Sequence, residues 1–143
     1  MKALLGIFLG SLMTVSFSTT QAAPETTLDP GSTSTEVILS NDPHTNAAYY
    51  NYNFGNVRVN YSRYHRFNLT NDTGKPVFVS NVVLLGNGFR GWNHCYGWLY
   101  PWQRCSTQVE FRPWYQGSYS GQLAFYVSSG NIFVNLYGWG VYW

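Results

Sequence analysis

Few residues in this sequence are of types that could carry out covalent chemistry, and their spacing does not bring them together. Cys95 and Cys105 are ten residues apart and lack the CxxC spacing of thiol–disulfide enzymes. Asp72 and Glu110 are single acidic residues that lie far apart in the predicted strand order, so a paired-carboxylate glycosidase is not indicated. We therefore expect no catalytic residues, and we predict that the protein is not an enzyme.

The three histidines form no metal-binding pattern. His44 lies in a loop-like segment, His65 lies on a predicted strand, and His94 adjoins Cys95. No HxH or HExxH spacing occurs, so structural or surface roles are favoured for all three. The sequence also lacks a G-x-S-x-G motif and a glycine-rich phosphate loop. We expect no metal site and no cofactor.

The first 22 residues have the layout of a secretory signal peptide. Lys2 precedes an apolar run over residues 3–17, and small residues follow at Ala22 and Ala23. Pro24 should hinder a cut directly before it, so we expect cleavage after Ala22, although a retained membrane anchor is the alternative. The run is too short for a typical spanning helix. We therefore expect a secreted or periplasmic protein with no membrane span after cleavage.

The mature chain is nearly uncharged and rich in aromatic residues. Charged residues make up 10% of the whole sequence and aromatic residues 19%, whereas the usual charged share is about 25%. Residues 23–48 begin with a Pro-, Ser- and Thr-rich stretch and predict a flexible leader, in which 37–39 could add an edge strand. Lys and Arg are not clustered, which argues against a nucleic-acid partner.

The positions of apolar residues in 49–143 predict strands and no helix. In 64–71, every second residue is predicted to face inward and the residues between them are polar. A turn signal follows at 71–74. Alternate residues of 105–111 form a second row of side chains that faces inward. Alternate residues of 119–127 form a third such row, and a hairpin turn follows at 128–131. The predicted inward row of the first segment is His65, Phe67, Leu69 and Asn71. Short alternating strands with such turns predict a β-sandwich or barrel.

An ordered set of motifs carries a resemblance to a known family. The motifs are Phe54-Gly55-Asn56-Val57, Phe67-x-Leu69-x-Asn71, Gly74-x-Pro76, Phe89, Cys95, Leu99, Cys105, Val109-x-Phe111-x-Pro113, Gly117-x-Tyr119-x-Gly121-x-Leu123 and Leu136-x-Gly138-x-Gly140. Together they closely resemble the ASPM/SPD-2/Hydin-type domain, known in bacteria as the choice-of-anchor D module. The resemblance covers about residues 52–141. It implies an all-β fold: an immunoglobulin-like, major-sperm-protein-like antiparallel β-sandwich of about seven strands, used for protein–protein scaffolding.

Two cysteines in an exported chain predict one structural disulfide. In the family, the cysteines join the loop after Phe89 to the next strand, so the resemblance implies a Cys95–Cys105 bridge. Closing a loop of that length contributes about 2–3 kcal/mol in the chain-entropy account. An intermolecular bridge and a reactive pair are the alternatives.

The loop departs from the family pattern by carrying aromatic residues where small polar ones are usual. The aromatic residues in and after the loop are Trp92, Tyr96, Trp98, Tyr100, Trp102, Trp114 and Tyr115. In one interpretation, Trp92, Trp98 and Trp102 fold back as a small core over the disulfide. In the other, the rings form an exposed patch that binds a protein or glycan, because Trp and Tyr combine a large apolar body with a polar tip.

Two classes of function are compatible with these residues. The first is a non-catalytic extracytoplasmic binding or adhesion module that recognises a protein or cell-envelope glycan through the aromatic loop. The second is a structural or assembly subunit of an envelope complex, which would self-associate through strand edges and through aromatic residues on the outer face of the last hairpin. Those outer-face residues are Tyr126, Phe133, Tyr137 and Trp139.

Overall fold

A computed structural model describes residues 26–28, 34–40 and 47–143 of the chain. The predicted signal peptide, His44 and much of the predicted leader lie outside these residues. The described part contains strands and no helix, so it holds no helix that could cross a membrane.

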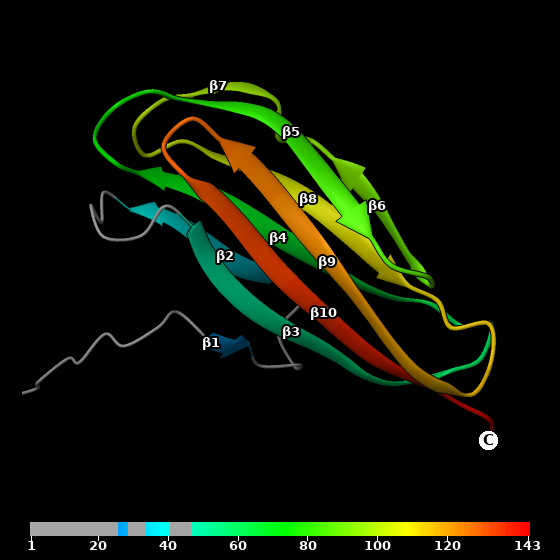
Figure 1. Cartoon of the computed structure of the whole chain (residues 1–143). Coiled ribbons are helices and arrows are strands. Elements are labelled where there is room, and N and C mark those ends of the chain that lie inside the picture. The colour runs from blue at the N-terminus through cyan, green and yellow to red at the C-terminus, as the bar shows by residue number, and fades with distance from the viewer. Residues whose placement is uncertain (1–25, 29–33, 41–46) are drawn as a thin grey trace, which may run out of the picture.

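In the described residues, ten strands form two sheets that pack face to face (Figure 1). They are β1 (Thr26–Leu28), β2 (Ser34–Ser40), β3 (Ala47–Arg58), β4 (Arg63–Asp72), β5 (Val77–Leu85), β6 (Phe89–Asn93), β7 (Gly97–Leu99), β8 (Arg104–Phe111), β9 (Gly117–Val127) and β10 (Asn131–Val141). One sheet has the order β1-β3-β10-β9-β5-β7, and the other has the order β2-β4-β8-β6.

The predicted all-β immunoglobulin-like sandwich is confirmed, but its sheets are mixed. Three pairs are parallel, namely β1 with β3, β2 with β4, and β3 with β10. Parallel strands need a crossover connection, and here the intervening chain passes through the other sheet. The strands also exceed the seven or so that were expected. The segment expected as a leader contributes β1 and also β2, which is an edge strand over the 37–39 positions considered for one, and the cysteine loop contributes β7.

The alternating pattern places the core as predicted. In β4, His65, Phe67, Leu69 and Asn71 are all buried, because successive side chains of a strand point to opposite faces of the sheet. Val37 of β2 is also buried and belongs to the same core. The other large buried side chains include Tyr52, Phe54, Phe111, Leu123, Phe125, Ile132 and Leu136.

The two sheets approach each other closely at Gly138 of β10. A Cβ atom built there would overlap the ring of Phe111, which comes from β8 in the opposite sheet. Phe111 in turn stacks on Phe89 with ring centroids 5.0 Å apart. The glycine therefore makes room for an aromatic layer between the sheets.

Candidate binding site at the disulfide-linked loop

The cysteine loop crosses from one sheet to the other and back. β6 belongs to the four-stranded sheet, β7 pairs with β5 at the edge of the six-stranded sheet, and β8 returns to the four-stranded sheet. The predicted disulfide between Cys95 and Cys105 is confirmed, with the two Cα atoms 5.0 Å apart. Cys95 is fully buried where the chain leaves β6. The disulfide therefore fastens this crossover to β8.

Asn93 fixes the start of the crossover. Its Oδ1 accepts hydrogen bonds from the Cys95 backbone N–H and from the Thr107 hydroxyl, both at 2.8 Å. Its Nδ2 donates to the Cys95 carbonyl oxygen, also at 2.8 Å. One amide side chain thus satisfies both backbone groups of the buried cysteine.

Asn71, at the end of β4, holds the far side of the loop. Its buried Nδ2 donates to the carbonyl oxygens of Leu99 at 2.8 Å and Lys75 at 2.7 Å. Its backbone N–H donates to the Gln103 carbonyl oxygen at 3.0 Å, and its own carbonyl oxygen accepts from the Trp102 N–H at 2.8 Å. Three of these four bonds, those with Leu99, Trp102 and Gln103, join the end of β4 to β7 and to the turn that follows it, and the fourth holds the turn after β4.

That turn places a tryptophan in a backbone conformation that side chains rarely adopt. The Gln103 N–H donates to the Tyr100 carbonyl oxygen at 3.0 Å, which closes a four-residue turn with Pro101 and Trp102 at its centre. Trp102 has φ of 67°. Proline followed by a residue with positive φ is the pattern of a type II turn, in which glycine is the usual second central residue. The site therefore carries a large ring at some cost in backbone energy.

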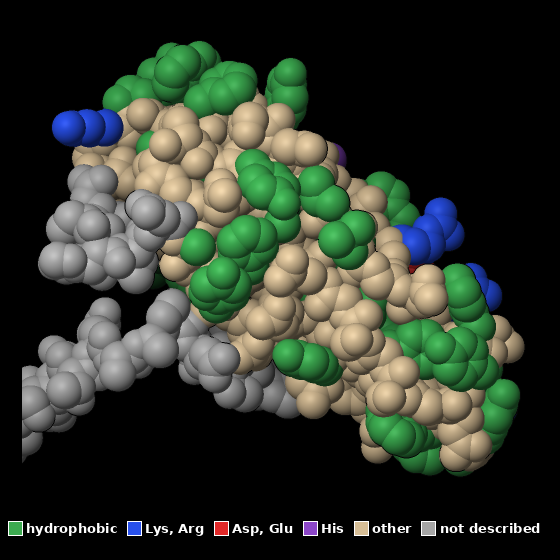
Figure 2. Space-filling view, in the orientation of Figure 1, with side chains coloured by type: hydrophobic (Ala, Val, Ile, Leu, Met, Phe, Trp, Pro, Cys, Tyr) green, Lys and Arg blue, Asp and Glu red, His purple; other side chains and the backbone are tan. Residues whose placement is uncertain are grey.

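The rings of the loop are exposed. The exposed fractions of Tyr96, Trp98, Tyr100 and Trp102 are 82%, 60%, 52% and 73%. Trp98 makes an edge contact with Phe78 of β5, with ring centroids 5.2 Å apart, and this contact covers only part of it. Figure 2 shows hydrophobic side chains gathered over β7. The interpretation in which Trp92, Trp98 and Trp102 fold back over the disulfide is therefore wrong, because all three are at least 45% exposed. We call Tyr96, Trp98, Tyr100 and Trp102 the aromatic loop.

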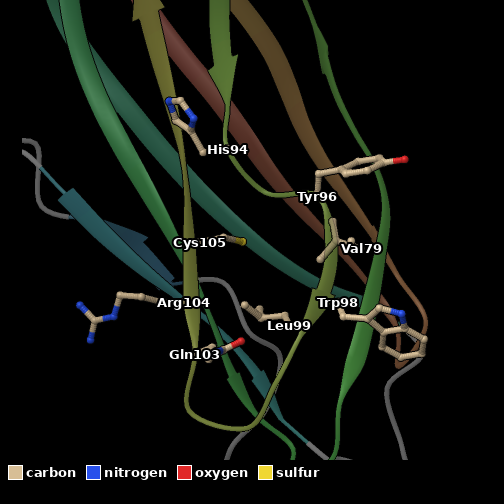
Figure 3. Close-up of a pocket in the computed structure, with 9 residues that line it drawn as sticks. Val79, His94, Tyr96, Trp98, Leu99, Gln103, Arg104 and Cys105 are labelled. Atoms are coloured by element: carbon tan, nitrogen blue, oxygen red, sulfur yellow. The ribbon is translucent and has the colours of Figure 1, made fainter.

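A hollow of about 350 Å³ lies between β7 and β8, next to the aromatic loop. Figure 3 shows Leu99 and Cys105 pointing toward one another across it, whereas the Tyr96 and Trp98 rings point away on the far side of β7. Arg104 points in the opposite direction from Trp98. Tyr96 and Trp98 thus line the hollow at β7 while their rings present an outward surface.

The structure places the other three predicted site residues elsewhere. Trp92 lies on β6, where its ring centroid is 6.4 Å from that of Tyr64 on the four-stranded sheet. Trp114 and Tyr115 lie in the connection between β8 and β9, at the opposite end of the sandwich from β7 (Figure 1). Their backbone N–H groups donate to the hydroxyl of the buried Tyr119 at 2.9 and 3.0 Å. Sequence proximity grouped these residues with the loop, but the strand order separates them.

The residues that could do chemistry are also separated. Glu110 is opposite Tyr64 near the start of β4, whereas Asp72 is the last residue of that strand. The Glu110 carboxylate accepts hydrogen bonds from the hydroxyls of Ser62 and Tyr64. His65 is buried with its ring stacked 3.9 Å from that of Tyr52, and its Nε2 is 2.7 Å from the Thr35 hydroxyl oxygen. Within the described ranges, no three His, Cys, Asp or Glu side chains lie together as a metal site.

No protein-family model matches the chain, and no curated protein matches its sequence. Similar solved structures exist. The secreted serine protease VesC from Vibrio cholerae aligns with a TM-score of 0.52 and 18% identity over 62% of this chain and 21% of that one. The ASH/PapD-like domain 7 of human CEP192 aligns with a TM-score of 0.52 and 12% identity over 70% of this chain and 84% of that domain.

A protein of unknown function from Porphyromonas gingivalis aligns with a TM-score of 0.50 and 10% identity, over 60% of this chain and 43% of that one. This chain thus spans about a fifth of VesC and less than half of the Porphyromonas protein. At these identities the likenesses show the fold. The chain has an immunoglobulin-like fold, which is similar to that of the PapD-like domain.

Proposed function

We propose that this protein is a non-catalytic binding module of the choice-of-anchor D type. It acts in the periplasm or outside the cell and contacts a protein or glycan through the aromatic loop. The proposal rests on the conformation and exposure of Trp102. This residue is 73% exposed, and its backbone has a φ of 67°. An exposed side chain held at a strained position is better explained by a contact outside the chain than by folding.

The loop is also rigid enough to be a binding surface. The Cys95–Cys105 disulfide and the hydrogen bonds of Asn71 hold its backbone on two sides. A partner would therefore meet a loop backbone that is already in place, which lowers the conformational entropy lost on binding. Trp and Tyr are the residue types that contribute most to binding energy at interfaces.

Two further features support the non-catalytic and extracytoplasmic parts of the proposal. The described acidic and histidine side chains are separated or hydrogen-bonded within the fold and form no catalytic pair. The disulfide is typical of an oxidising compartment, as a secreted or periplasmic location would provide.

The assembly subunit is the second candidate. The edges of the six-stranded sheet argue against edge pairing there, whereas β2 and β6, the edges of the four-stranded sheet, are seven and five residues long. β1 and β7, the edges of the six-stranded sheet, are each three residues long. Short edge strands are a common way in which proteins prevent edge-to-edge pairing. Size-exclusion chromatography with light scattering separates the two candidates. An assembly subunit should form an oligomer that persists on dilution, whereas a binding module should be a monomer.

A capture experiment tests the proposed function. The immobilised protein is incubated with envelope extract, and retention is compared with that by a Trp98→Ala, Trp102→Ala double variant. A Trp92→Ala, Trp114→Ala double variant is the matched control, because it removes two exposed tryptophans away from the loop. We expect at least tenfold less retained partner for the loop variant only. If both variants retain the partner and the loop variant merely has a lower Tm, the proposal is wrong.

A further inference from the structure

The two sheets differ sharply in charge. In the described residues, the strands of the six-stranded sheet contain one charged residue, Arg58 at the end of β3. The strands of the four-stranded sheet contain Glu36, Arg63, Arg66, Asp72, Arg90, Arg104 and Glu110. Figure 2 looks onto the outer face of the six-stranded sheet, where Lys and Arg side chains lie only at the margins. This outer face is therefore essentially uncharged.

Aromatic rings form the first row across this face. Phe133 of β10 is opposite Tyr49 of β3 in the register, and their rings stack with centroids 5.3 Å apart. Tyr126 of β9 meets Phe133 edge-on at 6.2 Å. Tyr49 and Tyr126 are 44% and 37% exposed, so the cluster presents ring surface to solvent.

Amide side chains form the next row. Asn135 of β10 is opposite Asn51 of β3 on one side and Gln122 of β9 on the other. Gln122 Nε2 donates to Asn135 Oδ1 at 3.2 Å, and Asn135 Nδ2 donates to Asn51 Oδ1 at 3.1 Å. The bonds run in one direction, so the chain ends in an amide donor on Asn51 and an amide acceptor on Gln122.

One more aromatic residue, Tyr137, follows the amide row on β10. Tyr137 is opposite Asn53 and Ser120 and is 44% exposed. Phe133, Asn135 and Tyr137 are each two residues apart along β10, which corresponds to about 7 Å. An aromatic ring, an amide and a second aromatic ring therefore follow one another at that spacing. Beyond Tyr137, a shallow groove of about 330 Å³ extends the face between Asn53, Ser118 and Trp139.

We propose that this face is a binding site for an uncharged, unbranched polysaccharide of β-1,4-linked pyranose units. Such a chain is a flat ribbon whose rings expose C–H faces and whose edges carry hydroxyl groups. The C–H faces match the Tyr49–Phe133 pair and Tyr137, and the hydroxyls, which both donate and accept, match the amide row between them. A charged polymer would lose hydration on this face and find no opposite charge in return.

This site is separate from the aromatic loop, and it does not depend on the proposed function of that loop. The Tyr49, Asn51 and Asn53 side of the face belongs to β3, whereas the loop lies along β7 at the other edge of the sheet. The aromatic loop can therefore fail to capture a partner from envelope extract while the outer face still binds polysaccharide. Equally, the loop can capture a partner while the face binds no polysaccharide.

Affinity electrophoresis tests the site with named probes. The protein is run in native gels that contain hydroxyethylcellulose, a neutral β-1,4-glucan, or polygalacturonate, an anionic polymer. The same proteins are titrated with cellohexaose and chitohexaose by calorimetry. We expect retardation by hydroxyethylcellulose only, and binding of at least one of the two hexasaccharides.

Variants locate the binding. Tyr137→Ala and Asn135→Ala should each weaken hexasaccharide binding at least tenfold, whereas Tyr64→Ala and Trp92→Ala, exposed rings on the four-stranded sheet, should leave it unchanged. Tyr137 is an exposed surface side chain, so its variant should keep the wild-type Tm. The proposal is overturned if no glucan retards the protein, if polygalacturonate retards it equally, or if only the control variants lose binding. It is also overturned if the face variants instead abolish a concentration-dependent dimer of this chain.

Discussion

The backbone N–H of Trp102 donates a hydrogen bond of 2.8 Å to the carbonyl oxygen of Asn71. Asn71 is fully buried at the end of β4, whereas the Trp102 ring is 73% exposed in the turn between β7 and β8. The bond thus connects the core directly to the most strained residue of the aromatic loop. It explains how a tryptophan can be kept at φ of 67° without the turn opening.

The strain at Trp102 predicts an unusual order of stability between two variants. Trp102→Gly should be more stable than Trp102→Ala by about 1 kcal/mol, because glycine adopts positive φ without a steric penalty. Both variants lose the ring, so the comparison isolates the backbone. Urea denaturation monitored by circular dichroism measures the difference. Equal stabilities, or a more stable alanine variant, would mean that the turn relaxes and stores no strain.

Removal of the Asn71 side chain should be costly. Asn71→Ala removes the hydrogen bonds to the Leu99 carbonyl oxygen and from the Thr73 N–H, whereas the Lys75 carbonyl oxygen keeps the bond from the Thr73 hydroxyl. Unsatisfied buried groups cost about 1–3 kcal/mol each, so we expect a loss of about 3 kcal/mol in the free energy of unfolding. Asn87→Ala, at an exposed turn, is the matched control and should change stability by less than about 0.5 kcal/mol. A loss below about 1 kcal/mol for Asn71→Ala would contradict the role assigned here.

Reduction of the disulfide should loosen β7 before the rest of the fold. Among the described strands β7 pairs only with β5, over three residues, so it depends on the fastened crossover. We expect the free energy of unfolding to fall by about 2–3 kcal/mol in a Cys95→Ala, Cys105→Ala variant. Hydrogen exchange should accelerate most at residues 97–99, while the amides of β9 and β10 follow the global stability. Uniform acceleration across both sheets would show that the disulfide does not act locally.

The close approach at Gly138 predicts a coupled pair of substitutions. Gly138→Ala should destabilise the sandwich by about 1–3 kcal/mol, because the added methyl group overlaps the Phe111 ring. Phe111→Leu frees space at the same point, so the double variant should lose less than the sum of the two single losses. Thermal unfolding of the four proteins in the cycle measures the coupling. Strictly additive losses would indicate that the sheets shift apart to accept the methyl group.

The part of the fold that depends on local pattern could be predicted from the sequence. Phe67, Leu69 and Asn71 are buried together because strand geometry alone sends alternate side chains to one face. The turn signal at 71–74 is likewise local, and Gly74 takes a positive φ there. Cys95 and Cys105 could be paired because they are the only two cysteines and the family resemblance places them.

The rest depends on contacts between distant segments. Val134 of β10 is opposite Tyr50 of β3, and no local pattern specifies that parallel register. β7 is a strand only because it pairs with β5, and the exposure of Trp98 depends on that pairing. The hairpin pattern placed Phe133 and Tyr137 on one outer face, but Tyr49, Asn51 and Asn53 join that face only through the parallel pairing of β3 with β10.

The most direct test of the binding function is the response of the individual tryptophans to the captured partner. The six indole N–H signals can be assigned by single Trp→Phe variants of the ¹⁵N-labelled protein. On addition of the material that the wild-type protein retains from envelope extract, the signals of Trp98 and Trp102 should shift or broaden, while those of Trp92 and Trp114 stay unchanged. A response confined to Trp92 or Trp114, or no response from any indole, would contradict the account.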